Sequence, residues 1–205
     1  PLTQRSNGGP SRAFTDPLAC LMYTSGSTGE PKGVVCTHDN VVFARDAIIS
    51  YLENRPDDIV INVLPFSFDY GLYQLLMTVA FGGTLVIENA FAFPAAILRS
   101  IEQYRVTGLP VVPTLVSLLL NSDLHQFDLS SLRYITNTAA ALPVTHIRKL
   151  RELLPQVRIY SMYGLTECKR ALYLPPEELG RRPSSVGIPI PGTNAWVEGT
   201  DGARV

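Results

Sequence analysis

Short apolar runs alternate with longer segments of helical periodicity along most of the chain. Residues 18–23 form a run that predicts a strand buried on both faces, and residues 33–37 also predict a strand. Further strands are predicted at residues 58–64, 84–87, 109–112, 133–136, 158–162 and 194–197, and helices at residues 40–52, 70–81, 94–104, 114–120 and 143–154. This alternation predicts an α/β fold with a mostly parallel sheet and flanking helices.

Proline and glycine mark where several of these segments begin and end. Pro94 and Pro143 each open a helix, and the pair Gly82-Gly83 ends the helix over residues 70–81. Residues 1–17 contain three prolines and two glycines with little apolar content, which is typical of a linker. Parallel sheets bind ligands beyond the carboxyl ends of their strands, so the loops after strands are the first place to look for a site.

The charge balance and the cysteines exclude several classes of function. Across 205 residues, 17 Lys and Arg against 18 Asp and Glu give a formal net charge of −1, so no surface for nucleic acid or an anionic membrane is expected. The longest apolar stretch, residues 71–87, is interrupted by glycines and is shorter than the ~20 residues of a membrane span. Cys20, Cys36 and Cys168 are too few and too widely spaced for a disulfide framework, which favours a cytoplasmic location.

A loop rich in glycine, serine and threonine lies between the first two predicted strands. Residues 23–33 read YTSGSTGEPKG. The glycines permit a tight backbone whose N–H groups converge on an anion, the hydroxyls can donate to phosphate oxygens, and Lys32 adds a positive charge. Pro31 precedes Lys32 and a strand follows, so this is not the G-x-x-x-x-G-K-[ST] loop of P-loop proteins. On composition alone, a flexible surface loop is an equal alternative.

A second polar motif ends the strand predicted at residues 158–162. Residues 161–167 read SMYGLTE. Tyr163 offers an aromatic face for a purine, Thr166 a hydroxyl for a phosphate or carboxylate, and Glu167 an anionic ligand for Mg²⁺. Taken alone, Tyr163 is explained equally well by core packing, and Glu167 by a charge exposed to solvent. Their combination, about 130 residues after the first loop, favours a site.

These two segments, in this order, resemble the signatures of the AMP-forming acyl/adenylate synthetases, which include acyl-CoA ligases, luciferases and adenylation domains of peptide synthetases. TNTAAALP at residues 136–143 is similar to the family segment that lies beside adenine, and SVGIPIPG at residues 185–192 to a family turn, which we interpret as structural. The resemblance implies that residues 18–199 are an ATP/AMP-binding fragment from the centre of the family's large N-terminal domain, and residues 200–205 a truncated end.

The resemblance also implies roles for individual residues. Lys32, Thr166 and Glu167 would be catalytic, with Glu167 holding Mg²⁺. The remaining residues implied in nucleotide binding are Thr24, Ser25, Gly26, Ser27, Thr28, Gly29, Ala139, Ala140, Tyr163 and Gly164. Those implied in the substrate pocket are Phe68, Asp69, Tyr70, Gly71, Met162 and Cys168.

The segment LPFSFDYG at residues 64–71 bears on the choice of acid. Peptide-synthetase adenylation domains carry a similar F-S-F-D string, whose Asp pairs with the substrate ammonium group; here that residue is Asp69. A buried carboxylate is costly without a partner, so Asp69 needs a substrate amine, a backbone donor or solvent. Leu165, where that subfamily usually has proline, and the apolar residues nearby favour a fatty or other apolar acid over an amino acid.

The implied activity is that of an ATP-dependent, AMP-forming ligase. It would convert a carboxylic acid into an acyl-adenylate and pass the acyl group to the thiol of coenzyme A or of a carrier-protein phosphopantetheine. Because family members are more than twice as long, we expect the isolated fragment to be inactive and to self-associate through exposed sheet edges. Two alternatives are a non-catalytic nucleotide-binding scaffold and a P-loop-type ATPase or kinase.

Overall fold

A computed structural model describes residues 17–24, 30–89 and 93–205. The main sheet has seven strands in the order β4-β3-β5-β6-β7-β8-β9. Its strands are β3 (Ile59–Asn62), β4 (Thr84–Ile87), β5 (Gly108–Val111), β6 (Tyr134–Asn137), β7 (Arg158–Tyr163), β8 (Leu172–Leu174) and β9 (Ile188–Pro189). The first five pair in parallel and the last two join antiparallel, so the predicted α/β fold with a mostly parallel sheet is confirmed.

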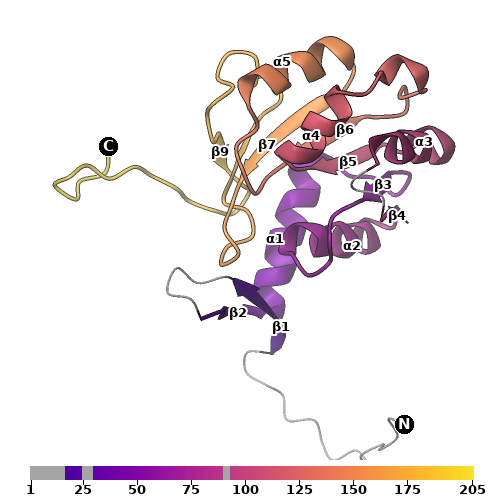
Figure 1. Cartoon of the computed structure of the whole chain (residues 1–205). Coiled ribbons are helices and arrows are strands. Elements are labelled where there is room, and N and C mark those ends of the chain that lie inside the picture. The colour runs from indigo at the N-terminus through magenta and orange to yellow at the C-terminus, as the bar shows by residue number, and fades with distance from the viewer. Residues whose placement is uncertain (1–16, 25–29, 90–92) are drawn as a thin grey trace, which may run out of the picture.

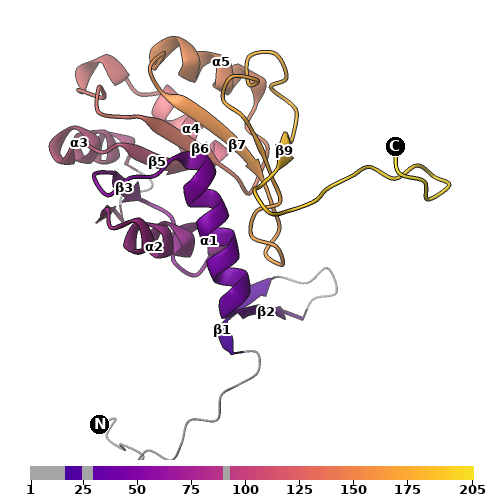
Figure 2. The ribbon, with the colours of Figure 1, turned by 180° about the vertical axis from the view of Figure 1, so that it is seen from behind.

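Helices cover both faces of this sheet. They are α1 (His38–Leu52), α2 (Asp69–Phe81), α3 (Pro94–Tyr104), α4 (Pro113–Leu120) and α5 (Val144–Leu153), with a short 3₁₀ turn at Leu124–Gln126. The helix α1 passes over one face with α2 beside it, and α4 lies on the other face between α3 and α5 (Figures 1 and 2). None of the described helices is long and apolar enough to cross a membrane.

The first two strands form a separate antiparallel hairpin, β1 (Leu18–Thr24) with β2 (Lys32–Thr37) (Figure 1). The prediction that residues 18–23 are buried on both faces is therefore wrong. One face carries Met22 and Cys36, which are buried, whereas Leu21, Tyr23 and Val35 on the other face are exposed. An apolar run alone does not distinguish a strand inside a sheet from one in a two-stranded hairpin.

The end of the chain also differs from expectation. Residues 194–197 are not a strand; the nearest pairing is a single bridge between Glu198 and Arg204. The strands β8 and β9 were missed because they have three and two residues, too few to show a pattern. The linker expected over residues 1–17 lies outside the described residues except for Pro17.

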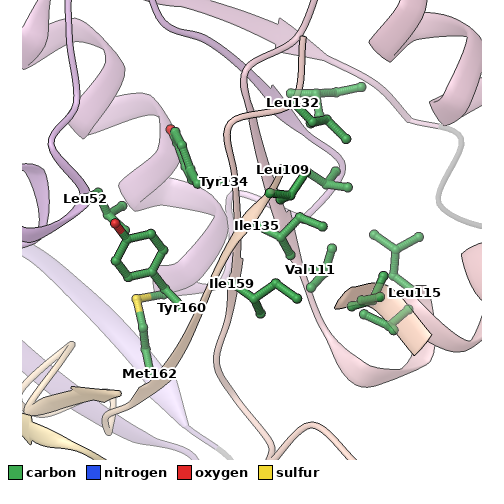
Figure 3. Packing of buried hydrophobic residues seen from close by; sticks show 14 of the residues in the cluster. Leu52, Leu109, Val111, Leu115, Leu132, Tyr134, Ile135, Ile159, Tyr160 and Met162 are labelled. Atoms are coloured by element: carbon green, nitrogen blue, oxygen red, sulfur yellow. The ribbon is translucent and has the colours of Figure 1, made fainter. Parts of the chain in front are cut away.

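The core lies between the sheet and its helices. Figure 3 shows Leu109, Val111 and Ile135 of neighbouring strands packed with Leu115 of α4, and Tyr160 and Met162 of β7 with Leu52 of α1 nearby. Side chains from both faces of the central strands are buried, as expected for parallel strands covered on each side. The predicted helix ends are confirmed at Gly82, which ends α2 in the left-handed conformation (φ 76°), and at Pro94, which opens α3.

Candidate functional site

The strand order creates a switch point between β3 and β5. After β3 the chain passes through α2 to β4 on one side, and after β5 it passes through α4 to β6 on the other. Loops that leave neighbouring strands in opposite directions open a crevice at the carboxyl ends of those strands. A cavity of about 580 Å³ lies there, and Leu64, which follows β3, and Val112, which follows β5, are both in its wall.

This first cavity brings together most residues of the predicted substrate pocket and several of the second motif. Its wall consists of Leu64, Pro65, Phe68, Asp69, Tyr70, Gly71, Val112, Thr138, Ala139, Gly164, Leu165, Thr166, Glu167, Lys169 and Arg170. They come from the loops after β3, β5, β6 and β7 and from the first turn of α2. Segments up to about 100 residues apart in the sequence therefore meet at one edge of the sheet.

A second cavity of about 600 Å³ adjoins the first. The two cavities share Thr138, Ala139, Gly164 and Leu165, and the second extends past Ala140, Met162 and Tyr163 to Ser185 and Val186. The turn at residues 185–192 thus lines a cavity in addition to making a structural turn, which the sequence interpretation did not include. Ala139, Ala140 and Ala141, on the loop after β6, are exposed and have small side chains in the wall of the second cavity.

Two asparagines fix the loops that form these walls. The side chain of Asn62, the last residue of β3, donates to the Leu64 carbonyl (3.0 Å) and accepts from the Leu64 N–H (3.2 Å). The side chain of Asn137, the last residue of β6, donates to the carbonyl of Ala140 (3.0 Å). Such short-range bonds from an amide side chain to the backbone hold a turn in one conformation.

Two glycines allow backbone segments to approach each other in the first cavity. A Cβ on Gly71 would lie 2.3 Å from the Pro65 carbonyl oxygen, and one on Gly164 would lie 2.1 Å from the Lys169 carbonyl oxygen. Both distances are far inside van der Waals contact. Glycine is therefore required for α2 to pack against the loop after β3, and for the loop after β7 to fold back on itself.

Asp69 is paired with a residue that the sequence reasoning missed. Its carboxylate lies 3.7 Å from the guanidinium of Arg170, which is 5% exposed and also stacks over the Tyr70 ring at 4.9 Å. The partners expected from the sequence were a substrate amine, a backbone donor or solvent. The available signal was the pair Lys169-Arg170, which follows the second motif after Cys168, since a basic residue close to a cavity carboxylate is a natural counter-ion.

Tyr70 anchors the first turn of α2 to the sheet. Its hydroxyl donates to the Thr136 carbonyl of β6 (2.7 Å) and contacts the Thr136 hydroxyl (2.8 Å). Burial raises the pKa of Tyr70 to about 12, so the phenol stays protonated and neutral. Tyr70 therefore positions the neighbouring Asp69 and cannot act as a base at neutral pH.

The glycine-rich loop is described only at its ends. Ser25, Gly26, Ser27, Thr28 and Gly29 lie outside the described residues. Thr24 and Lys32 are cross-strand partners at the loop end of the β1–β2 hairpin, where Lys32 is exposed, and neither lines the two cavities. Cys168 is exposed and is also absent from both cavity walls.

The residues present fit a nucleotide and one magnesium ion. Ala139, Ala140 and Gly164 leave backbone open to a flat base, and the adjacent Tyr163 is 45% exposed, so its ring is available for stacking. Glu167 is an exposed carboxylate in the first cavity wall. No group of three or more metal-ligating side chains occurs among the described residues, and Mg²⁺ typically takes one or two carboxylates and completes its shell with phosphates and water.

Comparisons with a family model and with known proteins agree on one family. Residues 5–205 match the family model described as "AMP-binding enzyme". "Acyl-CoA synthetase 7" of Caenorhabditis elegans is 34% identical over 196 residues, and "L-proline--[L-prolyl-carrier protein] ligase" of Streptomyces coelicolor is 36% identical over 199 residues. These alignments cover 90% and 92% of this chain but 36% and 37% of the relatives, so the chain spans little more than a third of their length.

A solved structure with a bound amino acid is also similar. The complex of VinN with L-aspartate shares 40% identity and a TM-score of 0.77, over 88% of this chain and 46% of that one. The parallel sheet, the cavities at its carboxyl edge and the two motifs are thus parts of a known kind of domain. The chain belongs to the AMP-binding enzyme family, whose similar members include acyl-CoA ligases and carrier-protein ligases.

Proposed function

We propose that the protein containing this chain activates a carboxylic acid with ATP, forming an acyl-adenylate and pyrophosphate, and passes the acyl group to a thiol. The observation that carries the proposal is the pair of adjoining cavities, one suited to a nucleotide and one containing Thr166 and Glu167. In this reaction the acid's carboxylate attacks the α-phosphorus of ATP and pyrophosphate leaves. Catalysis of such a step consists of positioning the two reactants and neutralising charge.

The residues divide this work between them. Tyr163 holds the adenine ring in the second cavity, and Thr166, in the wall of the first cavity, binds the α-phosphate. Lys32, with the hydroxyls and amides of residues 24–29, binds the β- and γ-phosphates. Glu167 holds Mg²⁺, which supplies positive charge to the leaving pyrophosphate. The thiol acceptor is that of coenzyme A or of a carrier-protein phosphopantetheine.

We propose an amino acid as the substrate class. Four charged side chains, Asp69, Glu167, Lys169 and Arg170, surround the first cavity. The 3.7 Å separation of Asp69 and Arg170 exceeds hydrogen-bond length, so the carboxylate retains capacity to accept from a substrate ammonium group. Similarity to the proline ligase and to the L-aspartate complex supports this choice over the apolar acid that the sequence favoured.

An apolar acid is the second candidate. Leu64, Pro65, Phe68, Val112 and Leu165 give the first cavity an extensive apolar wall. For such an acid, Arg170 would neutralise Asp69 and the substrate would need no ammonium group. The similarity to an acyl-CoA synthetase supports this alternative.

ATP–pyrophosphate exchange by the full-length protein tests the proposal. Fatty, aryl and amino acids are compared in the wild type and in Glu167→Ala, Asp69→Asn and the matched control Asp57→Asn. We expect exchange with an amino acid, loss of exchange in Glu167→Ala, and an increased KM in Asp69→Asn but not in Asp57→Asn. Exchange with a fatty acid that survives Asp69→Asn would select the second candidate. No exchange with any acid would favour the nucleotide-binding scaffold, and ADP as product would favour an ATPase or kinase.

A further inference from the structure

Two cysteines face each other across the β1–β2 hairpin. Cys20 and Cys36 are direct partners in the antiparallel register. Directly opposed residues of antiparallel strands have Cα atoms about 4.5–5.5 Å apart, within the range that a disulfide requires. Both thiols are free, Cys36 being buried and Cys20 half-buried. The register therefore places the two cysteines within reach of a disulfide.

A lysine connects this pair of thiols to the wall of the first cavity. The Lys169 ammonium donates to the Cys36 sulfur at 2.9 Å and to the Thr166 carbonyl at 2.5 Å. Lys169 is 3% exposed and has a left-handed backbone (φ 62°), so its loop is held in a conformation that costs energy. A buried ammonium group needs acceptors, and Cys36 is one of two that the structure gives it.

We propose that Cys20 and Cys36 are a modification site, where a small-molecule disulfide oxidises the two thiols to an intrachain disulfide and removes Cys36 as a partner of Lys169. The more exposed Cys20 sulfur attacks the small-molecule disulfide, forming a mixed disulfide and releasing one small thiol that takes the proton. The Cys36 sulfur then attacks the Cys20 sulfur and releases the second small thiol with the other proton. Two protein thiols are oxidised and one small-molecule disulfide is reduced.

Oxidation at this site changes the loop that contains Thr166 and Glu167. Once Cys36 is bonded to Cys20, Lys169 retains the Thr166 carbonyl and loses its sulfur partner. The amides of Cys168 and Lys169 bond to the Leu165 carbonyl within the same loop, so loss of the anchor opens these bonds more often. The site needs no catalytic activity, so its test is independent of the proposed function.

Thiol mapping of the 205-residue chain tests the disulfide. The chain is incubated with oxidised glutathione, alkylated, digested and analysed by mass spectrometry. We expect one cross-linked peptide pair joining Cys20 to Cys36 and a protein mass lower by two hydrogens, with glutathione retained only on the exposed Cys168. Cys168→Ser should form the same cross-link and Cys20→Ser should not. Glutathione on Cys20 without a cross-link, or a cross-link to Cys168, would overturn the proposal.

Amide hydrogen exchange tests the connection to the cavity. In the cross-linked chain, the protected amides of residues 168–170 should exchange about tenfold faster, as expected when a hydrogen bond to a charged group is weakened. Treated Cys20→Ser should keep the slow rate, and Lys169→Met should exchange fast before oxidation and no faster after it. Far-UV circular dichroism checks that each variant is folded. If Lys169→Met does not fold, the exchange rates of the treated wild-type chain and of treated Cys20→Ser still test the connection. Exchange that is unchanged on cross-linking would refute the connection.

Discussion

Tyr163 and Tyr104 provide a matched pair for testing the nucleotide site at the level of one side chain. They are 45% and 47% exposed, but Tyr163 lines the second cavity and Tyr104 ends α3. A base stacked on an aromatic ring loses about 1–3 kcal/mol when the ring is removed, so we expect Tyr163→Ala to weaken AMP binding to the 205-residue chain about tenfold. Isothermal titration calorimetry measures this, and Tyr104→Ala should bind as the wild type does. Equal losses in the two variants would argue against stacking on Tyr163.

A methyl group at Gly164 should separate the two ends of its loop. A Cβ there would lie 2.1 Å from the Lys169 carbonyl oxygen, whereas at Gly33 the nearest atom would be 3.5 Å away, an ordinary contact. We expect Gly164→Ala to lower the free energy of unfolding by about 1–3 kcal/mol, the usual cost of overpacking, and Gly33→Ala to change it little. Urea denaturation compares the two variants. Similar free energies of unfolding in Gly164→Ala and Gly33→Ala would mean that the loop after β7 accommodates the methyl group without loss of stability.

Sequence motifs point to single residues, whereas the partners of those residues depend on tertiary packing. Tyr163, Thr166, Glu167 and Asp69 were identified because motifs specify residue types at fixed spacing, and all four line the two cavities. The pairing of Asp69 with Arg170 could not be predicted, because it depends on how α2 packs against a loop about 100 residues later in the chain. The roles of all the predicted site residues, Lys32 and Cys168 included, stay predictions.

At the level of elements, a polar network joins the amino ends of three parallel strands. Asp58, which is 2% exposed and precedes β3, accepts bonds from the Arg133 guanidinium before β6 (2.8 Å) and from the Thr107 hydroxyl before β5 (2.9 Å). The Asn54 side chain donates to Asp58 as well (3.1 Å). This network lies at the end of the sheet opposite the cavities, so it contributes to the alignment of the strands and not to the site.

Protonation of Asp58 should therefore destabilise the sheet. Burial raises the pKa of Asp58, but hydrogen bonds from Arg133, the Arg55 N–H, Asn54 and Thr107 outweigh it and hold the pKa below the ordinary value. A carboxylate with a lowered pKa stabilises the fold above its unfolded-state pKa, and the contribution is lost as the pH falls through the folded-state pKa.

We expect the free energy of unfolding to decrease below about pH 4 and Asp58→Asn to reduce this dependence. At neutral pH the variant should lose about 3 kcal/mol, because it leaves Arg133 without its charge partner. Urea denaturation between pH 3 and pH 7 measures both effects, with the exposed neighbour Asp57→Asn as control. A wild-type pH profile retained in Asp58→Asn would assign the acid sensitivity to other carboxylates.

Elements with several turns or a clear stop signal could be predicted, and short or isolated ones could not. The helices α2 and α3 match their predicted ends to within one residue, because Gly82 and Pro94 impose a stop and a start. Whether a strand joins the main sheet depends on the strands that pair with it. This is why the prediction that residues 18–23 are buried on both faces is wrong. The order β4-β3-β5-β6-β7 likewise follows from tertiary pairing, and so the position of the switch point required the structure.

At the scale of the whole molecule, the β1–β2 hairpin presents an apolar surface that favours association. Leu21, Tyr23 and Val35 share its outer face and are 45%, 68% and 64% exposed. The sheet edges expected to pair with another copy are short, four residues in β4 and two in β9. Few backbone hydrogen bonds are available along such edges, so the outer face of the hairpin is the better candidate for contact.

We therefore expect the 205-residue chain to form concentration-dependent oligomers in sedimentation velocity experiments. Leu21 and Val35 are direct cross-strand partners, so Leu21→Glu combined with Val35→Lys places opposite charges side by side and preserves the hairpin while removing its apolar face. This double variant should sediment as a monomer. Val79→Lys, which removes a more exposed apolar residue (73%) on α2, should associate as the wild type does, because single exposed apolar residues rarely drive association. Oligomers retained in the double variant would indicate that the chain associates through the edges of the seven-stranded sheet instead.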